Sequence, residues 1–353
     1  MAGVDYTGEL VAQVRDAADK GQALRIVGGD SKTFYGRHSE GTPLQLVNHH
    51  GIVSYDPTEL VITARAGTSL NEIDSALAEH GQMLPFDPPR FGPHATIGGA
   101  VASGLAGPCR PWRGAPRDLV LGVKLLDGMG RVQSFGGQVM KNVAGYDIAR
   151  LMAGSLGTLG VLLEISLKVL PHPAVDRTLV LEMDRERGLH KMRELSAKPV
   201  PLAGACHLQD RLYLHLSGNE SGVDAWEKQI GGERGTGENF WTRLRDQQLD
   251  FFQQDAPLWR ISLPPATGCR DFDAEALTDW AGAQRWLYTD MPAEQLREEV
   301  ARHGGHATLF RGGDRHGQVF QSLDPVTLRL HEGLKRTFDP MGIFNPGRMY
   351  AEF

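Results

Sequence analysis

The segment 154–160, Gly-Ser-Leu-Gly-Thr-Leu-Gly, places three glycines three residues apart, directly before the apolar run 161–165. Glycine lets a backbone approach a ligand closely, so this spacing predicts a loop whose amides and small hydroxyls meet something flat or anionic. A Rossmann domain instead carries Gly-x-Gly-x-x-Gly after a strand and before a helix. Here a helical pattern precedes the glycines and a strand pattern follows them. The sequence therefore predicts a nucleotide-binding fold of another kind.

Composition narrows the class of protein. The chain has 353 residues, 43 glycines and a formal net charge of −6. This length suffices for two domains, and the negative charge argues against a nucleic-acid-binding surface. No run of about 20 apolar residues occurs, so no membrane span is predicted, and the acidic N-terminus does not resemble a signal peptide. The three separated cysteines, Cys109, Cys206 and Cys269, favour a reducing compartment and are too few for an all-cysteine iron–sulfur cluster.

The apolar pattern changes at Pro171 and Pro173. Before this point we expect helices over 7–20, 69–80 and 147–152, and strands over 24–27, 60–65, 119–126, 131–135 and 161–171. The helix after Ser69 is expected to open with a capping box to Glu72. After the change we expect strands over 178–183, 205–208, 211–216, 258–263, 285–289 and 307–311. The helices expected there are 184–197, 222–230, 239–252, 273–281, 292–303 and 325–337.

Two further glycine-rich segments lie in the first 165 residues. The segment 27–31, Val-Gly-Gly-Asp-Ser, ends a predicted strand with amides pointing one way, which suits phosphate oxygens. Taken alone, it is weak evidence for a ligand, because an ordinary tight turn explains it better. The segment 96–99, Thr-Ile-Gly-Gly, opens a run of small residues to 107, whose alternative is a Gly/Ala-packed helix without a ligand. Three such loops together predict a large, elongated, phosphate-bearing ligand.

These three segments, with the C-terminal segment 339–347, Asp-Pro-Met-Gly-Ile-Phe-Asn-Pro-Gly, resemble the vanillyl-alcohol-oxidase or PCMH-type family of FAD flavoproteins. Within that family, segments 104–108, 110–114, 117–122 and 141–147 resemble the smaller FAD-binding subunits of bacterial glycolate oxidases. The resemblance implies the fold class α+β, with a PCMH-type two-part FAD-binding domain over 1–172. It also implies an α+β cap or substrate domain over 173–320 and a C-terminal segment, 321–353, that returns to the FAD domain.

The resemblance further implies cofactor contacts from each glycine segment. The first would cradle the pyrophosphate, the second would follow the ribityl chain, and the third would line the adenosine and flavin. The residues it assigns to FAD are Gly28, Gly29, Asp30, Ser31, Lys32, Thr96, Ile97, Gly98, Gly99, Ser103, Gly104, Gly107, Arg117, Asp118, Gly145, Gly154, Ser155, Gly157, Thr158, Gly160, Val161 and Asn345. On this basis Gly98→Val or Gly157→Val is predicted to abolish FAD binding by filling the space of the cofactor.

The mode of FAD attachment is a point of departure from some family members. Those members attach FAD covalently through a histidine beside the first glycine loop or a cysteine in the second. Asp30 stands at the first position here, and Cys109 lies near the second loop but is not expected to react. We therefore expect non-covalent FAD.

Oxidation of a 2-hydroxy acid needs a hydride acceptor, a base and a cation that holds the carboxylate. The candidates for the cation are Arg110, Arg113, Arg260 and Arg311. The alternative for each arginine is an ion pair at a surface or interface. The sequence does not identify the base, and the catalytic residues stay unassigned.

Two histidine pairs are candidates for metal ligands. His303 and His306 fall where a predicted helix ends, a position where histidines are usually structural. His49 and His50 are adjacent, so their side chains diverge. Neither pair has convincing ligand spacing, and no metal site is predicted.

The resemblance implies partners, because this chain has no iron–sulfur cluster to carry electrons onward. It implies a larger FAD subunit, an iron–sulfur subunit and a small 2-hydroxy-acid substrate, with glycolate oxidised to glyoxylate. It also implies a cytoplasmic location, with any attachment to the inner face of the membrane made through partners. Three interpretations stay open: a subunit of a glycolate oxidase, a self-sufficient 2-hydroxy-acid dehydrogenase, and a non-catalytic FAD-containing scaffold.

Overall fold

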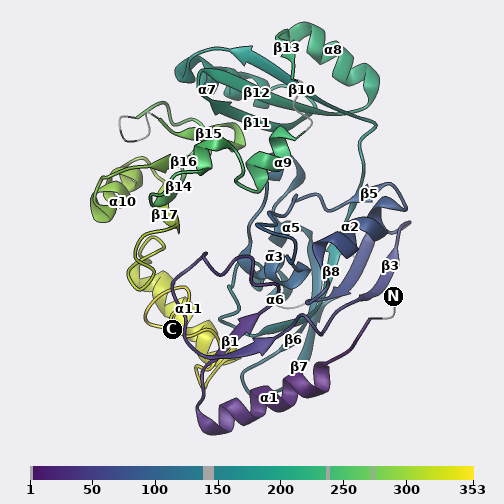
Figure 1. The fold of residues 1–353 in the computed structure, drawn as a ribbon, viewed down its shortest axis with the longest axis vertical. Helices are drawn as coiled ribbons and strands as arrows, with labels where there is room; N and C mark the ends of the chain where they lie inside the picture. The colour runs from purple at the N-terminus through teal and green to yellow at the C-terminus, as the bar shows by residue number, and fades with distance from the viewer. Residues whose placement is uncertain (1–2, 138–146, 236–238, 271, 273–274) are drawn as a thin grey trace. The chain divides into compact units, whose positions relative to one another are not determined.

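The structure is a computed structural model that describes residues 3–137, 147–235, 239–270, 272 and 275–353 (Figure 1). Its contacts divide the chain into two compact units. The first unit comprises Met1–Leu105, Ala115–Pro171 and Asp314–Phe353, and the second comprises Ala106–Gly114 and His172–Gly313. The domain boundaries predicted from the sequence lie after residues 172 and 320. That prediction keeps residues 106–114 in the FAD-binding domain, whereas the structure assigns them to the second unit.

The first unit holds a five-stranded sheet with the order β3-β4-β8-β6-β7, in which every neighbouring pair is antiparallel. Strands β1 and β2 form a separate parallel pair, and β5 pairs with β9. The elements are α1 (Thr7–Lys20), β1 (Leu24–Val27), β2 (Thr42–Gln45), β3 (Ile52–Asp56), β4 (Val61–Arg65), α2 (Leu70–Ala78), β5 (Gln82–Met83), α3 (Ile97–Ser103), α5 (Pro116–Leu119), β6 (Val120–Leu126), β7 (Val132–Gly136), α6 (Ile148–Leu151), β8 (Val161–Lys168), β9 (Leu170–Pro171) and α11 (Pro325–Phe338).

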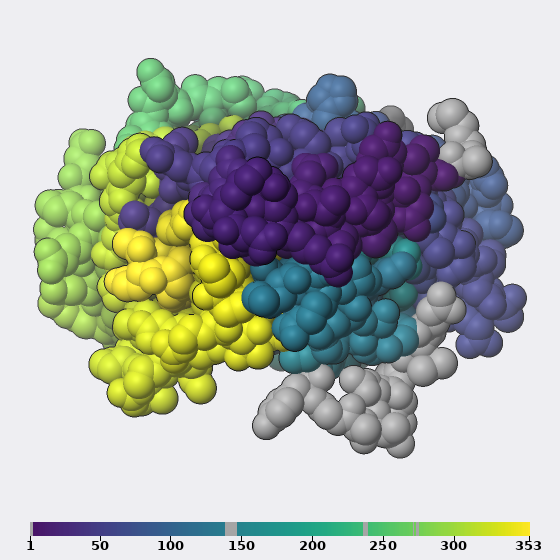
Figure 2. Space-filling view, turned by 90° about the horizontal axis from the view of Figure 1, so that it is seen from below, coloured from purple at the N-terminus to yellow at the C-terminus, as the bar shows by residue number. Residues whose placement is uncertain are grey.

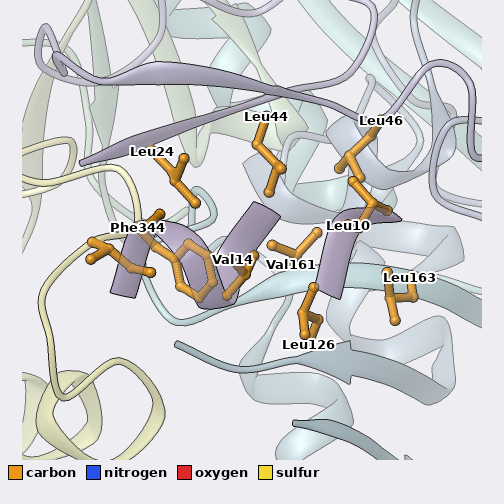
Figure 3. Close-up of a cluster of buried hydrophobic side chains, with 11 residues drawn as sticks. Leu10, Val14, Leu24, Leu44, Leu46, Leu126, Val161, Leu163 and Phe344 are labelled. Atoms are coloured by element: carbon orange, nitrogen blue, oxygen red, sulfur yellow. The ribbon is translucent and has the colours of Figure 1, made fainter. Parts of the chain in front are cut away.

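The spacing of apolar residues in helix α1 explains how this helix packs in the first unit. Its apolar residues Leu10, Val14 and Ala17 recur at helical spacing and are all buried. The helix ends at Gly21, whose φ of 61° is the left-handed conformation that glycine adopts without strain. The buried face packs on side chains from β1, β2, β6, β8 and the C-terminal segment (Figure 3). One apolar core therefore joins both ends of the chain.

The C-terminal segment lies beside β1. The Leu24 amide donates to the Ile343 carbonyl at 2.7 Å, and the Asn345 amide donates to the Leu24 carbonyl at 2.9 Å. Figure 2 shows the N-terminal segment in purple and the C-terminal segment in yellow side by side on one face. Residues 343–345 are thereby held beside β1, the strand that leads into the first glycine loop.

The second unit is built on one eight-stranded sheet with the order β13-β10-β12-β11-β15-β16-β14-β17. Two apolar clusters pack on it: one includes Leu189 and Met192 of α7, and the other includes Leu296 and Val300 of α10. The elements are α4 (Arg110–Arg113), β10 (Val175–Glu182), α7 (Arg185–Ser196), β11 (Leu202–Leu208), β12 (Arg211–Gly218), α8 (Glu220–Ile230), β13 (Glu233–Arg234), α9 (Phe240–Arg245), β14 (Leu258–Ser262), β15 (Leu277–Asp279), β16 (Gln284–Tyr288), α10 (Ala293–Arg302) and β17 (His306–Arg311), with 3₁₀ turns at Asp250–Phe252 and Trp280–Gly282.

Two predicted helices of this unit are wrong in the described residues. The helix expected over 273–281 is replaced by strand β15, because Leu277–Asp279 pair with β16 and Thr278 also pairs with His207 of β11. Strand pairing in the sheet overrides the local helical pattern there. The helix expected over 239–252 ends at Arg245, and a separate 3₁₀ turn follows at Asp250–Phe252.

Candidate functional site

A groove in the first unit collects residues from all three glycine segments and from the C-terminus. The first segment contributes Gly28, Gly29, Asp30, Ser31 and Lys32. The second contributes Thr96, Gly99 and Ser103, the third contributes Leu156, and the C-terminus contributes Asn345 and Arg348. Arg25, Ile26, Val27, Thr33 and Ala102 complete the lining. Segments that lie far apart in the sequence therefore share one concave site.

The first glycine loop is shaped to receive an anion. A Cβ at Gly29 would overlap the carbonyl oxygen of His94, and a Cβ at Gly28 would lie 2.6 Å from the Thr96 hydroxyl oxygen. Asp30 follows in the left-handed conformation with a φ of 57°. Among the described residues, none accepts a hydrogen bond from the amides of Gly28, Gly29, Asp30 or Ser31. Successive unpaired amides of this kind form a nest for phosphate oxygens.

The second segment is the start of helix α3. The Thr96 hydroxyl accepts a hydrogen bond from the Gly99 amide at 3.2 Å and so caps the helix. Gly98 packs on the protein itself, because its Cβ would lie 2.7 Å from both the Cβ and the carbonyl oxygen of Ala66. Ile97 is buried in the core. At the other end, Gly104 ends the helix in the left-handed conformation with a φ of 64°.

The third segment wraps around the carboxyl end of α3. The Gly154 amide donates to the Val101 carbonyl at 3.0 Å, and the Leu156 amide donates to the Ala102 carbonyl at 2.8 Å. Gly104 and Gly154 meet backbone to backbone, since a Cβ on Gly104 would lie 2.9 Å from the Gly154 Cα. Leu156 is the described residue of this loop that lines the groove. The other members, Ser155, Thr158, Gly160 and Val161, are buried beneath it.

The Asn345 side chain links two segments that line the groove. Its Oδ1 accepts from the Ile26 amide at 2.8 Å, and its Nδ2 donates to the Leu156 carbonyl at 2.7 Å. A Cβ at Gly157 would lie 2.7 Å from that same Nδ2. One buried carboxamide therefore holds β1 and the third glycine loop at a fixed spacing. The glycine at 157 makes room for Asn345, a protein neighbour.

Lys335 is a supporting residue that the sequence reasoning missed. Its ammonium is buried and donates to the carbonyls of Thr158 and Phe344, each at 2.8 Å. It also pairs with the Asp339 carboxylate at 2.8 Å, and that carboxylate accepts the amides of Ile343 and Phe344. The available signal was the spacing of four residues between the lysine and the aspartate in the last helical turn.

Three cations border the groove: Arg25, Lys32 and Arg348. Arg348 is fixed by its own donors, which reach the carbonyls of Arg37 and Thr33 at 2.9 Å each. Burial, and then the positive charge of Arg25, lower the pKa of Arg348 to about 10, while the Asp30 carboxylate opposes that shift. The concentration of positive charge favours a ligand with more than one negative charge.

Several predicted cofactor residues lie outside the groove lining. The Gly107 carbonyl accepts from the Trp280 indole at 3.0 Å, and Gly107 belongs to the second unit. Arg117 is exposed, and the Asp118 carboxylate accepts the Ala115 amide at 3.0 Å at the start of α5. Gly145 lies outside the described residues.

The four candidate arginines for a substrate carboxylate all lie in the second unit and all have protein partners. The Arg113 guanidinium donates to the Ser217 hydroxyl at 2.6 Å and lies 3.8 Å from Asp176. Arg311 donates to Gln247 at 3.1 Å, and burial lowers its pKa. Arg110 stacks on the Trp280 ring, and Arg260 stacks on the Phe310 ring.

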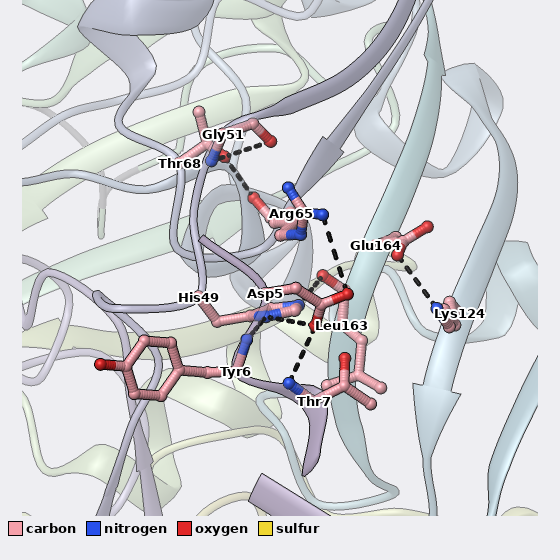
Figure 4. A network of polar contacts seen from close by, with 10 residues as sticks. All are labelled: Asp5, Tyr6, Thr7, His49, Gly51, Arg65, Thr68, Lys124, Leu163 and Glu164. Carbon is pink, nitrogen blue, oxygen red and sulfur yellow. Dashed lines mark hydrogen bonds and ion pairs between the residues drawn. The ribbon is translucent and has the colours of Figure 1, made fainter. Parts of the chain in front are cut away.

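The histidine pairs have structural surroundings. His49 is buried, where its Nδ1 accepts the Tyr6 amide at 3.0 Å and its Nε2 lies 3.1 Å from the Leu163 carbonyl (Figure 4). His303 lies 3.6 Å from Glu299, one turn earlier in the chain, and burial lowers the pKa of His306. Among residues 3–137, 147–235, 239–270, 272 and 275–353, no three His, Cys, Asp or Glu side chains form a metal-binding group.

Comparison with known proteins defines the class. Residues 3–136 match a family described as an FAD binding domain, and residues 288–349 match the C-terminal domain of FAD-linked oxidases. The structure is similar to p-cresol methylhydroxylase, with a TM-score of 0.74, 16% identity, and coverage of 100% of this chain and 89% of that one. It is also similar to alkyldihydroxyacetonephosphate synthase, with a TM-score of 0.67, 14% identity, and coverage of 97% and 75%. The fold is thus that of the PCMH-type FAD-linked oxidoreductases.

Sequence relatives then define the group within that class. The chain is 48% identical to the glycolate oxidase subunit GlcE of Escherichia coli over 99% of this chain and 98% of that protein. It is 26% identical to a D-lactate dehydrogenase of Anaerostipes hadrus over 88% of this chain and 80% of that protein. The chain belongs to the GlcE family of FAD-binding flavoproteins.

The residues present fit FAD. Four amides that have no acceptor among the described residues, together with the three bordering cations, suit the two negatively charged phosphates of the cofactor. Glycine is needed at position 28 because a Cβ there would lie 2.6 Å from the Thr96 hydroxyl oxygen. The groove therefore offers a diphosphate site at the end of β1. No helix within the described part of the chain is long and apolar enough to cross a membrane.

Proposed function

We propose that this chain is the FAD-binding subunit of a glycolate oxidase that oxidises glycolate to glyoxylate and passes the electrons to partner subunits. The observation that carries the proposal is the 48% identity to the Escherichia coli subunit over nearly the whole of both proteins. A second relative, the glycolate oxidase subunit GlcD of Bacillus subtilis, is 32% identical over 46% of this chain and 33% of that protein. This supports a larger, related flavin subunit as a partner.

The proposal gives each part of the groove a task. The amides of residues 28–31 would bind the diphosphate of FAD, with Arg25 and Arg348 supplying positive charge. Asn345 and Lys335 would hold the third glycine loop at the cofactor. Attachment would be non-covalent, because Asp30 stands at the loop and Cys109 is a buried residue of the other unit. An iron–sulfur partner and a cytoplasmic location, with any membrane attachment made through partners, belong to the same proposal.

When bound, FAD supplies the acceptor for the hydride of the 2-hydroxy acid. The chain must then hold the substrate carboxylate and take the hydroxyl proton. Arg110, Arg113, Arg260 and Arg311 stay the candidates for the carboxylate, and the base stays unassigned.

A second candidate function is that of a self-sufficient 2-hydroxy-acid dehydrogenase. The similarity to a D-lactate dehydrogenase over 88% of this chain favours it. The third interpretation, a scaffold that binds FAD without catalysis, predicts no reduction of this flavin in any context.

Anaerobic addition of glycolate to the FAD-loaded chain separates the three functions. For the proposed subunit, the flavin absorbance near ~450 nm should bleach only when the larger flavin subunit and the iron–sulfur subunit are present. Bleaching of the isolated chain would support the self-sufficient dehydrogenase. Full activity of a complex rebuilt with FAD-free chain would support the scaffold and refute the proposal.

A further inference from the structure

The groove that receives FAD contains one carboxylate, that of Asp30, among its cations. Asp30 Oδ1 lies 3.4 Å from the Arg25 guanidinium, and the Thr33 hydroxyl donates to the same oxygen. Burial and the positive charge of Arg25 lower the pKa of Arg348, and the Asp30 carboxylate raises it. A negative side chain therefore compensates the two arginines of the diphosphate site.

The position of this carboxylate places it in competition with the cofactor. The Asp30 amide belongs to the group of four unpaired amides, so its side chain is attached to the nest itself. A diphosphate bound to those amides brings like charge close to the Asp30 carboxylate and opposite charge close to Arg25. The Arg25–Asp30 pair is partly exposed, with 30% and 56% of the two side chains accessible. Such a pair is weak enough to be exchanged for another anion.

We propose that Asp30 is a built-in counter-anion of the diphosphate site. In the FAD-free protein its carboxylate neutralises Arg25, and the incoming diphosphate takes over that arginine while Asp30 keeps its hydrogen bond from Thr33. The exchange lowers the affinity for FAD and makes FAD release depend on ionic strength. This inference rests on the assignment of the groove to FAD.

The geometry around Asp30 allows a substitution that removes the charge and keeps the loop conformation. The side-chain oxygen of Asn can accept the hydrogen bond that the Thr33 hydroxyl donates to the Asp30 carboxylate, and Asn tolerates the left-handed backbone at φ 57°. Asp30→Asn therefore removes the charge and retains the loop. Asp56→Asn is the matched control, because Asp56 also holds a turn, through the amides of Thr58 and Glu59, and does not line the groove.

The test is the rate of FAD release from the FAD-loaded chain, followed by the rise of flavin fluorescence after dilution. Asp30→Asn should slow release about five-fold at low salt, the range expected for one partly screened charge pair. The difference should shrink at high salt, and Asp56→Asn should match the wild type. Arg25→Gln should speed release. ADP, which shares the diphosphate but not the flavin, should bind the FAD-free Asp30→Asn chain more tightly by a similar factor.

Release from Asp30→Asn at the wild-type rate or faster, at low salt, would overturn the inference. Asp30→Gly provides the same test if the asparagine variant does not fold, because glycine also suits the left-handed position. The readout does not depend on turnover. A flavin in this chain that glycolate does not reduce even with the partner subunits present would refute the proposed function and leave this inference standing, whereas equal release rates would refute the inference alone.

Discussion

Lys335→Met should destabilise the first unit strongly, because it removes a charge that is buried and fully engaged. The ammonium makes three contacts of 2.8 Å, to the carbonyls of Thr158 and Phe344 and to the Asp339 carboxylate. Methionine is similar in length and apolar, so the variant loses the charge and the hydrogen bonds with little loss of volume.

The loss in the free energy of unfolding is set by the Asp339 carboxylate, which stays buried without its cation. Asp339 is 1% exposed, and after the substitution its carboxylate retains, among the described residues, the amides of Ile343 and Phe344. Removal of one partner of a buried ion pair costs about 3–5 kcal/mol, since the remaining charge is uncompensated. The loss should appear in the unit that holds the groove, because Thr158 belongs to the third glycine loop.

The assay is urea denaturation of the FAD-loaded chain, followed by circular dichroism and by flavin fluorescence. Arg336→Met is the control: Arg336 is the next residue of α11, its side chain is 73% exposed, and it lies 3.9 Å from Glu332. We expect less than about 1 kcal/mol for the control, the usual value of a surface pair. A free energy of unfolding for Lys335→Met within about 1 kcal/mol of the control would refute the assignment of Lys335 as a buried clamp.

Two further predictions concern pH and cofactor attachment. Burial lowers the pKa of His49 below its usual value of 6.5, so the folded state binds fewer protons than the unfolded state. Its contribution to stability is therefore complete above pH 6.5 and is lost as the pH falls toward the lower folded pKa; burial shifts His207, His306 and His331 in the same direction. The unfolding midpoint should decrease as the pH is lowered through this window, and His49→Gln should reduce this pH dependence; an unchanged pH dependence in His49→Gln would contradict the argument. Acid precipitation of the FAD-loaded chain should leave the flavin in the supernatant, and flavin retained in the pellet would show a covalent bond.

The elements with strong local patterns could be predicted from the sequence. Helix α1 and strand β1 begin and end where the apolar spacing and Gly21 placed them. The strands expected over 119–126 and 131–135 are also present, as β6 and β7, and they pair with each other. Strand β15 was missed because its pairing with β11 and β16 depends on residues more than sixty positions away as well as on near neighbours.

The glycines illustrate what sequence reasoning could not decide. Gly98 and Gly157 were expected to leave room for a cofactor, and the structure places Ala66 and Asn345 against them. Valine at either position would therefore disturb the protein before it met any ligand. Loss of FAD from those variants would not identify a contact with the cofactor.

The sequence by itself indicated the kind of site, because three glycine-rich segments together predict close backbone approach to one large ligand, whereas each segment alone also fits a turn or a packed helix. It also determined the family, through motifs spread from residue 28 to residue 347. Only the tertiary structure decided which glycines face the groove and which face protein, and which charges border it. Long-range contacts such as Asn345 with Leu156 and Lys335 with Thr158 depend on how distant segments pack, and no local pattern encodes that packing.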